Sequence, residues 1–256
     1  MNCKICNTLV DLAFTSKVLN KYDVKYYKCK SCEGLFTEDA YWIEEAYSRA
    51  INISDTGLVQ RNIYFSKILS VFIYLNFNRN GMFLDYAGGY GLFTRLMRDI
   101  GFDFYWHDPY TKNLLASGFE YKTESKYDLI TAFEVFEHLA NPLEEISKML
   151  QITDSIAFST EVIPEDIPHP SEWWYYGFNH GQHLFLYSEK TLVTIAQHFK
   201  LHYYRLSGIH ILTKKKITSF KIFLNKFYKV GLSQLVKVNM ISKIQSDYES
   251  IKKQMN

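Results

Sequence analysis

Short apolar runs alternate with amphipathic segments through the middle of the chain. Each run is bounded by polar residues or glycine and has the length of a buried strand. The runs are Met82–Leu84, Phe102–His107, Tyr127–Phe133 and Ile156–Thr160, with a further short strand expected within 117–126. After the first run, Leu92, Phe93, Leu96 and Met97 recur at helical spacing. Strands that alternate with helices predict an α/β fold with a largely parallel sheet. Residues 203–206 and 209–213 are expected to add a final hairpin.

The connection between the first predicted strand and its helix is rich in glycine. It contains Ala87, Gly88, Gly89 and Gly91, and it follows Asp85 directly. Glycines let the backbone pass close under a ligand, and the N-terminus of a helix points free N–H groups into the same space. The turn therefore predicts a nucleotide-binding site at the carboxyl edge of the sheet.

Acidic and basic residues follow the next strands at the same edge. Asp108 ends the second run, where folds of this kind place an acid that binds ribose hydroxyls. Glu134 follows the third run directly, and Glu137 and His138 lie on the same segment. Arg61, on the preceding helical stretch, is a candidate to close over the cofactor, and a solvated helix face is the alternative.

The segments from Leu84 to Leu150 resemble the class I S-adenosylmethionine-dependent methyltransferases, whose glycine motif reads Asp/Glu-x-Gly-x-Gly-x-Gly. Asp85, Gly89 and Gly91 match this motif, while Ala87 replaces the first glycine, at little cost only if its φ is negative. The resemblance implies a Rossmann-like sheet, mostly parallel with an antiparallel last strand, with helices on both faces. S-adenosylmethionine is the implied cofactor. A dinucleotide is the competing ligand, but the Asp85 carboxylate would repel its phosphates and suits a cationic amino acid group.

All four cysteines lie near the N-terminus in two Cys-x-x-Cys pairs. They are Cys3, Cys6, Cys29 and Cys32. Two such turns can aim four thiolates at one zinc ion, and a four-cysteine site has no open position for substrate. We therefore expect a structural zinc ion that folds a small module of residues 1–40. A redox pair or free thiols are the alternatives. The remaining chain divides into a helical linker or lid (41–80), the Rossmann-like domain (81–216) and basic amphipathic helices (217–256).

The stretch from Ser171 to Ser188 combines aromatic rings with imidazoles. The predicted substrate-binding residues are Trp173, Trp174, Tyr175, Tyr176 and Gln182, and the histidines are His180 and His183. Aromatic faces stack on sugar rings, and histidine exchanges protons near neutral pH.

With the cysteine module, this stretch resembles the sugar methyltransferases, including deoxysugar C-methyltransferases, whose segment reads Glu-His-x-x-Tyr-Phe-Ser. The resemblance implies that His183 is catalytic, whereas the family's glutamate is Gln182 here, which weakens the case for deprotonating carbon. His183 is therefore the predicted base for a hydroxyl, with His180 and His138 as alternatives. The other interpretation is that these histidines are structural.

The resemblance implies O-methylation of a hydroxyl on a nucleotide-linked sugar, for capsule or other surface polysaccharide synthesis. Three alternatives remain open: a C-methyltransferase of a nucleotide-linked keto-deoxysugar, a lipid or quinone O-methyltransferase, and a non-catalytic zinc-ribbon binding module. Failure to bind S-adenosylmethionine would favour the last of these.

Composition limits the classes of partner that the protein is expected to bind. The formal charge of +2 gives no overall basic signature, so we do not expect nucleic acid as a partner. From Lys214 onward the chain has ten lysines and only two acids, Asp247 and Glu249. This basic end favours either a helix for packing or dimerisation, or a surface that contacts a membrane or a diphosphate-bearing substrate. Signal-peptide patterning is absent, and the apolar run 68–75 is far shorter than the ~20 residues of a membrane span. A cytoplasmic protein is expected.

Overall fold

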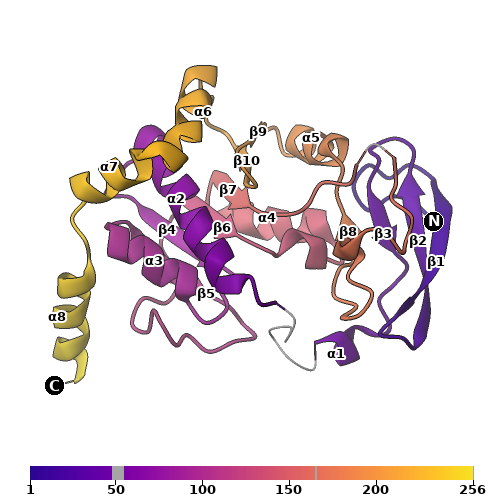
Figure 1. Cartoon of the computed structure of the whole chain (residues 1–256), viewed down its shortest axis with the longest axis horizontal. Helices are drawn as coiled ribbons and strands as arrows, with labels where there is room; N and C mark the ends of the chain where they lie inside the picture. The colour runs from indigo at the N-terminus through magenta and orange to yellow at the C-terminus, as the bar shows by residue number, and fades with distance from the viewer. Residues whose placement is uncertain (48–54, 165, 256) are drawn as a thin grey trace.

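The computed structural model describes residues 1–47, 55–164 and 166–255, and its centre is a six-stranded sheet (Figure 1). The strand order is β5-β4-β6-β7-β10-β9. The strands are β4 (Met82–Tyr86), β5 (Asp103–His107), β6 (Leu129–Ala132), β7 (Ser155–Phe158), β9 (His202–Arg205) and β10 (His210–Thr213). β4, β5, β6 and β7 pair in parallel, while β10 is antiparallel to both β7 and β9. The predicted mostly parallel sheet and its closing hairpin are confirmed. Within 117–126 the structure has a single β-bridge, from Glu120 to Trp106, in place of a strand.

Helices cover both faces of this sheet, as expected. Successive side chains of a strand point to opposite faces, so Phe83 and Leu84 of β4 belong to two different core clusters. The cluster around Phe83 is completed by α2 (Leu58–Asn76) and α3 (Leu92–Ile100). The cluster around Leu84 is completed by α4 (Pro142–Ile152) and α5 (Glu189–His198).

A second sheet of four strands contains the N-terminal segment, and Figure 1 draws three of its strands in indigo and the fourth in orange. It contains β1 (Val10–Val18), β2 (Tyr22–Cys29), β3 (Leu35–Thr37) and β8 (Phe185–Leu186), in that order. Because β8 comes from the aromatic stretch between β7 and β9, this pairing ties the cysteine module to the segment that carries His180 and His183.

Short helices and the C-terminal segment complete the described chain. They are α1 (Ile43–Ala46), η1 (Phe136–His138), η2 (Trp174–Tyr176), α6 (Ser219–Asn225), η3 (Lys226–Val230), α7 (Leu232–Asn239) and α8 (Ile244–Met255). The C-terminal helices lie along α2 and α3, where the Tyr228 hydroxyl donates to the Tyr64 hydroxyl and Arg98 binds Asp247. Across the described residues, no helix has both the length and the apolar character needed to cross a membrane.

Candidate functional site

The turn between β4 and α3 brings the predicted cofactor residues to the carboxyl edge of the sheet. Ala87, Gly89 and Gly91 have φ values of 54°, 54° and 85°, in the left-handed region that favours glycine. A Cβ on Gly89 would meet no atom within 4 Å, whereas a Cβ on Gly88 would lie 2.7 Å from Asp85 Oδ2. Gly89 therefore faces open space. Because the φ of Ala87 is positive, the alanine that replaces the first glycine of the motif carries backbone strain.

Asp85 supports this turn from within the protein. Its side chain is buried, and the hydroxyls of Thr94 and Thr131 donate to it over 3.1 and 2.8 Å. Burial raises the pKa of this carboxyl group to about 7. Since Thr94 lies on α3 and Thr131 on β6, the carboxyl group joins β4, α3 and β6. These three elements form the carboxyl edge of the sheet at the glycine turn, which we call the cofactor edge.

Asp108 holds the outer side of the turn. One of its oxygens accepts the backbone N–H of Gly89 at 3.0 Å, and the other accepts those of Tyr110 and Thr111 at 2.8 and 3.0 Å. A carboxylate has about four acceptor positions, so these bonds leave one free for a ligand hydroxyl. The half-buried position of Asp108 fits the predicted ribose contact.

Glu134 stands at the end of β6 with a positive φ of 55°. Ser159 donates to its Oε1 at 2.6 Å, and Arg61 Nε lies 3.3 Å from its Oε2. Arg61 also binds Asp55, over 2.7 Å. This ion pair attaches the start of α2 to the cofactor edge.

Glu137 is the most enclosed acid of this segment. It is 1% exposed, and the Tyr175 hydroxyl donates to its Oε1 at 2.7 Å. Its Oε2 has no hydrogen-bond partner among the described residues. Burial, together with repulsion from Glu134, raises the pKa of Glu137 to about 8.

The three predicted catalytic histidines lie together, and their hydrogen bonds divide them into two kinds. His138 Nδ1 and His183 Nδ1 lie 3.0 and 2.6 Å from the carbonyl oxygens of Gln182 and Tyr175. A carbonyl can only accept, so each Nδ1 carries the proton and each Nε2 keeps a lone pair. His180 Nδ1 instead accepts the backbone N–H of Gln182 at 3.2 Å, which puts its proton on Nε2. Burial lowers the pKa of His138 to about 4 and that of His183 well below its ordinary value.

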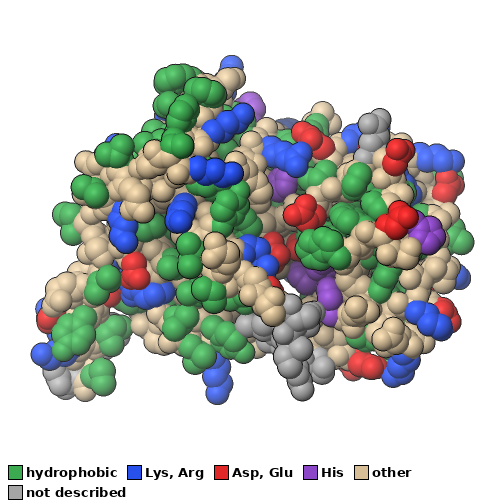
Figure 2. All heavy atoms as spheres, viewed as in Figure 1, with side chains coloured by type: hydrophobic (Ala, Val, Ile, Leu, Met, Phe, Trp, Pro, Cys, Tyr) green, Lys and Arg blue, Asp and Glu red, His purple; other side chains and the backbone are tan. Residues whose placement is uncertain are grey.

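Glu137, His138 and His183 form one cluster. A donor atom from each lies within 4.8 Å of the other two. Figure 2 shows histidine and acidic side chains gathered near the middle of the face drawn there. We call these three residues the Glu-His-His cluster.

The predicted substrate residues occupy different environments. Trp174 is 77% exposed, and the ring of Tyr175 lies 4.6 Å from that of His183. Tyr176 is only 1% exposed and stacks on Phe178, so no face of its ring remains for a substrate. Gln182 is also buried, and its amide donates to the Ala46 carbonyl. These positions correct the expectation for Tyr176 and Gln182, which act as packing and tethering residues. The fifth residue, Trp173, is partly buried.

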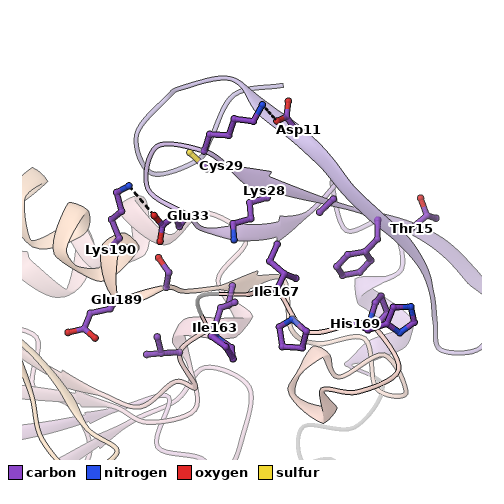
Figure 3. A pocket seen from close by; sticks show the side chains of 18 residues that line it. Asp11, Thr15, Lys28, Cys29, Glu33, Ile163, Ile167, His169, Glu189 and Lys190 are labelled. Carbon is purple, nitrogen blue, oxygen red and sulfur yellow. Dashed lines mark hydrogen bonds and ion pairs between the residues drawn. The ribbon is translucent and has the colours of Figure 1, made fainter.

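A pocket of ≈ 1270 Å³ lies between the N-terminal sheet and the loop that precedes η2 (Figure 3). Ion pairs join Lys190 to Glu33 and Lys30 to Asp11 at its rim. The six charged lining residues are three acids and three lysines, namely Asp11, Glu33, Glu189, Lys28, Lys30 and Lys190. Because its charges balance and its lining excludes the glycine turn, this pocket is separate from the cofactor edge and offers no net attraction to a diphosphate.

The four cysteines converge as their spacing predicted. Cys3 Sγ lies 3.5 Å from Cys32 Sγ, and Cys6 Sγ lies 3.4 Å from Cys29 Sγ. All four sulfur atoms are within 4.8 Å of one another. A tetrahedral zinc ion with Zn–S bonds of ~2.3 Å needs sulfur atoms ~3.8 Å apart. The cluster therefore fits such an ion closely.

Comparison with known proteins agrees with this geometry. The family described as "Methyltransferase domain" matches residues 60–205, more than half of the chain. The chain belongs to this family. The matched residues run from α2 to β9 and so contain the glycine turn and the Glu-His-His cluster. No curated protein matches the chain.

Solved structures share the fold of the methyltransferase domain. An O-methyltransferase family protein from Burkholderia thailandensis aligns with a TM-score of 0.50 at 13% identity, over 74% of this chain and 66% of its own. The chain thus spans just under two thirds of that protein. The plantazolicin methyltransferase BpumL, solved in complex with S-adenosylhomocysteine, aligns with a TM-score of 0.51 at 12% identity, over 77% and 85%.

Two connections in this region have no counterpart in the sequence pattern. The bond from Tyr175 to Glu137 joins residues 38 positions apart, and the Arg61–Glu134 ion pair joins α2 to the end of β6. No local pattern marks either partner. The one available signal for Glu137 was its place beside His138 after an apolar strand.

Proposed function

We propose that this methyltransferase transfers the methyl group of S-adenosylmethionine to a hydroxyl of a nucleotide-linked sugar, for capsule or other surface polysaccharide synthesis. The observation that carries the proposal is the shared edge of β4 and β6. These strands pair in parallel, so the glycine turn after β4 and the Glu-His-His cluster after β6 lie at neighbouring strand ends. The choice of a sugar rests on the resemblance of the cysteine module and the aromatic segment to sugar methyltransferases.

The cofactor edge fits S-adenosylmethionine. Gly89 offers a backbone face with no neighbouring atom where a Cβ would stand, and Asp108 retains an acceptor position for a ribose hydroxyl. Glu134 lies at the adjacent strand end. When bound, S-adenosylmethionine supplies a methyl group already activated on a sulfonium ion. The protein's task is to place the acceptor oxygen in line with it and to assist loss of the hydroxyl proton.

We assign activation of the acceptor hydroxyl to the Glu-His-His cluster. His138 and His183 each present a free lone pair at Nε2, whereas the His180 lone pair is used by a backbone N–H. His183, the base predicted from the sequence, is thus kept as a member of the cluster, and His180 is given no direct role. Trp174, exposed beside Tyr175, is the aromatic surface that remains for the sugar ring.

The test is release of S-adenosylhomocysteine from protein offered nucleotide-linked sugars, free sugars and a quinol, with NMR to locate the methyl group on oxygen or carbon. His183→Asn should lower turnover by about 100-fold or more, as expected when help with loss of the hydroxyl proton is removed. Its affinity for S-adenosylmethionine should stay within about twofold. Trp174→Ala should raise KM with little change in kcat. Methylation of carbon would refute the O-methyltransferase assignment, and wild-type turnover in His183→Asn would refute the role of the cluster.

We further propose that the four cysteines bind a structural zinc ion. The sulfur spacing supports this, as do the backbone N–H groups of Ile5 and Cys32, which donate to Cys3 Sγ and Cys29 Sγ at 3.4 Å. Such N–H···S bonds stabilise thiolates. A site closed by four protein ligands stabilises the fold and takes no part in methyl transfer.

A lipid-linked acceptor is the second candidate, because the C-terminal helices expose large apolar side chains. Phe220, Phe223 and Phe227 are 66%, 52% and 41% exposed, with Lys221 and Lys226 between them. Such a surface suits a membrane that carries anionic lipid. Flotation with vesicles of phosphatidylglycerol and phosphatidylcholine would test it: wild-type protein should float, and a Phe220→Ser/Phe223→Ser variant should not.

A further inference from the structure

Glu137 has an unsatisfied acceptor oxygen in the interior. The residue is 1% exposed, and Tyr175 satisfies Oε1 while Oε2 has no partner among the described residues. A buried polar atom without a partner loses its bonds to water and gains none in return, and the cost is larger if the group is charged. In a natural protein such a group calls for an explanation, and a bound ion that supplies the missing bond is one.

Two imidazoles lie beside Glu137, and each has one free lone pair. Both His138 and His183 donate their Nδ1 proton to a backbone carbonyl, so Nε2 is the free nitrogen of each ring. This arrangement is typical of histidines that bind metal ions, because the carbonyl fixes both the tautomer and the ring orientation. One ring nitrogen of each histidine and one carboxylate oxygen of Glu137 lie within 4.8 Å of one another.

We propose that Glu137, His138 and His183 bind a divalent first-row transition metal ion. Two imidazole nitrogens and one carboxylate oxygen suit Mn²⁺, Fe²⁺, Co²⁺ or Zn²⁺ better than Mg²⁺, which prefers oxygen ligands throughout. Three protein ligands leave coordination positions open, which is the pattern of catalytic sites. The cysteine cluster, by contrast, uses four thiolates and is closed.

Tyr175 is the positioning residue of this site. Its hydroxyl donates to Glu137 Oε1 at 2.7 Å, and its carbonyl accepts the Nδ1 proton of His183 at 2.6 Å. One residue thus orients two of the three ligands, while the Gln182 carbonyl orients the third. This gives the buried Tyr175 hydroxyl a role that packing alone does not provide.

The role of the ion rests on the proposed function. An acceptor hydroxyl that occupies an open coordination position loses its proton to water more readily, because the ion stabilises the alkoxide. The oxygen lone pair then forms the O–C bond, and the S–C bond breaks with its electron pair passing to sulfur. The products are the methyl ether and neutral S-adenosylhomocysteine, and the proton released to water balances the charge.

Metal binding can be measured without activity. Protein freed of loosely held metal, with zinc retained in the cysteine cluster, is titrated with Mn²⁺ while electron paramagnetic resonance reports the free ion. We expect one bound Mn²⁺ per chain. Glu137→Gln and His183→Asn should weaken binding at least 10-fold, and Tyr175→Phe by about 10- to 100-fold. His180→Ala is the matched control and should bind Mn²⁺ as the wild type does, since its imidazole has no free lone pair.

Calorimetry with S-adenosylmethionine on the same proteins separates this inference from the proposed function, and circular dichroism confirms that each variant is folded. Mn²⁺ binding that is lost in Glu137→Gln, with cofactor binding intact, supports the metal site. No second metal in the wild type, by Mn²⁺ titration and by metal count after loading with Zn²⁺, overturns the site and leaves the methyltransferase proposal standing. Unchanged Mn²⁺ affinity in both ligand variants also overturns it. Failure of the wild type to bind S-adenosylmethionine would instead refute the proposed function.

Discussion

Replacing Asp247 with alanine tests how the last helix is attached to the methyltransferase domain. Arg98 on α3 and Asp247 on α8 form a two-pronged ion pair, with Nε–Oδ2 at 2.8 Å and Nη2–Oδ1 at 2.7 Å. Their side chains are only 4% and 7% exposed. Arg95 adds a third bond to the same carboxylate, at 2.9 Å.

The cost of this substitution follows from the charge that it leaves behind. Removing one partner of a buried ion pair costs about 3–5 kcal/mol, because the other charge stays desolvated. Arg98 would keep its bonds to Asp103 and to the Phe104 carbonyl, which favours the lower end, about 3 kcal/mol. For a chain of this size each kcal/mol lowers Tm by about 2–4 °C, so the expected loss is about 6–12 °C.

Differential scanning calorimetry and hydrogen exchange on α8 would measure this effect. Glu249→Ala on the exposed side of α8 is the matched control and should change stability by less than about 0.5 kcal/mol. Since water does not screen the pair, the loss should persist in about 1 M NaCl. A fall in Tm below about 2 °C with α8 still protected from exchange would show that the pair contributes no net stability.

Three further predictions concern the turn, its buried acid and the cysteines. Ala87→Gly should raise the free energy of unfolding, measured in urea, by about 0.5–1 kcal/mol. A left-handed φ costs an L-residue about 1–2 kcal/mol, and the added freedom of glycine in the unfolded chain offsets part of that gain. Destabilisation would mean that packing of the Ala87 methyl group outweighs the backbone strain. Burial raises the pKa of Asp85 from 3.8 to about 7, so its contribution to stability is full below pH 3.8 and is lost as the pH rises to 7. Asp85→Asn should therefore gain stability relative to wild type between about pH 4 and pH 7 in urea unfolding of the ligand-free protein, and a parallel pH dependence of the two would contradict the shift. A strong chelator, or Cys29→Ser, should unfold β1–β3 while the large sheet persists, because a structural zinc site supplies folding free energy. Hydrogen exchange would measure this, and protection of β1–β3 that survives zinc removal would refute the structural role.

The cofactor edge shows which features local sequence determines. The positions of Asp85, Gly89, Gly91 and Asp108 in a strand, a turn and a strand end follow from the sequence, because these elements succeed one another within the chain and each leaves a periodic or glycine signal. Their contacts with a cofactor stay a prediction, and Asp85 is buried against Thr94 and Thr131. The left-handed φ of Ala87 was not determined by its own identity, since alanine prefers negative φ. The surrounding turn imposes it, through bonds such as that from the Gly91 N–H to the Gly88 carbonyl.

The Glu-His-His cluster shows what local sequence does not determine. Sequence alone determined the α/β class, the strand that precedes Glu137 and His138, and the two cysteine pairs, because these depend on spacing between near neighbours. Tertiary structure decided that His183 approaches Glu137, that Tyr175 orients both, and that Tyr176 and Gln182 turn inward. β8 pairs with β3 of the cysteine module and so carries this segment back to the end of β6. Contacts between residues so far apart in the chain are chosen by how two sheets pack, and no local pattern encodes that choice.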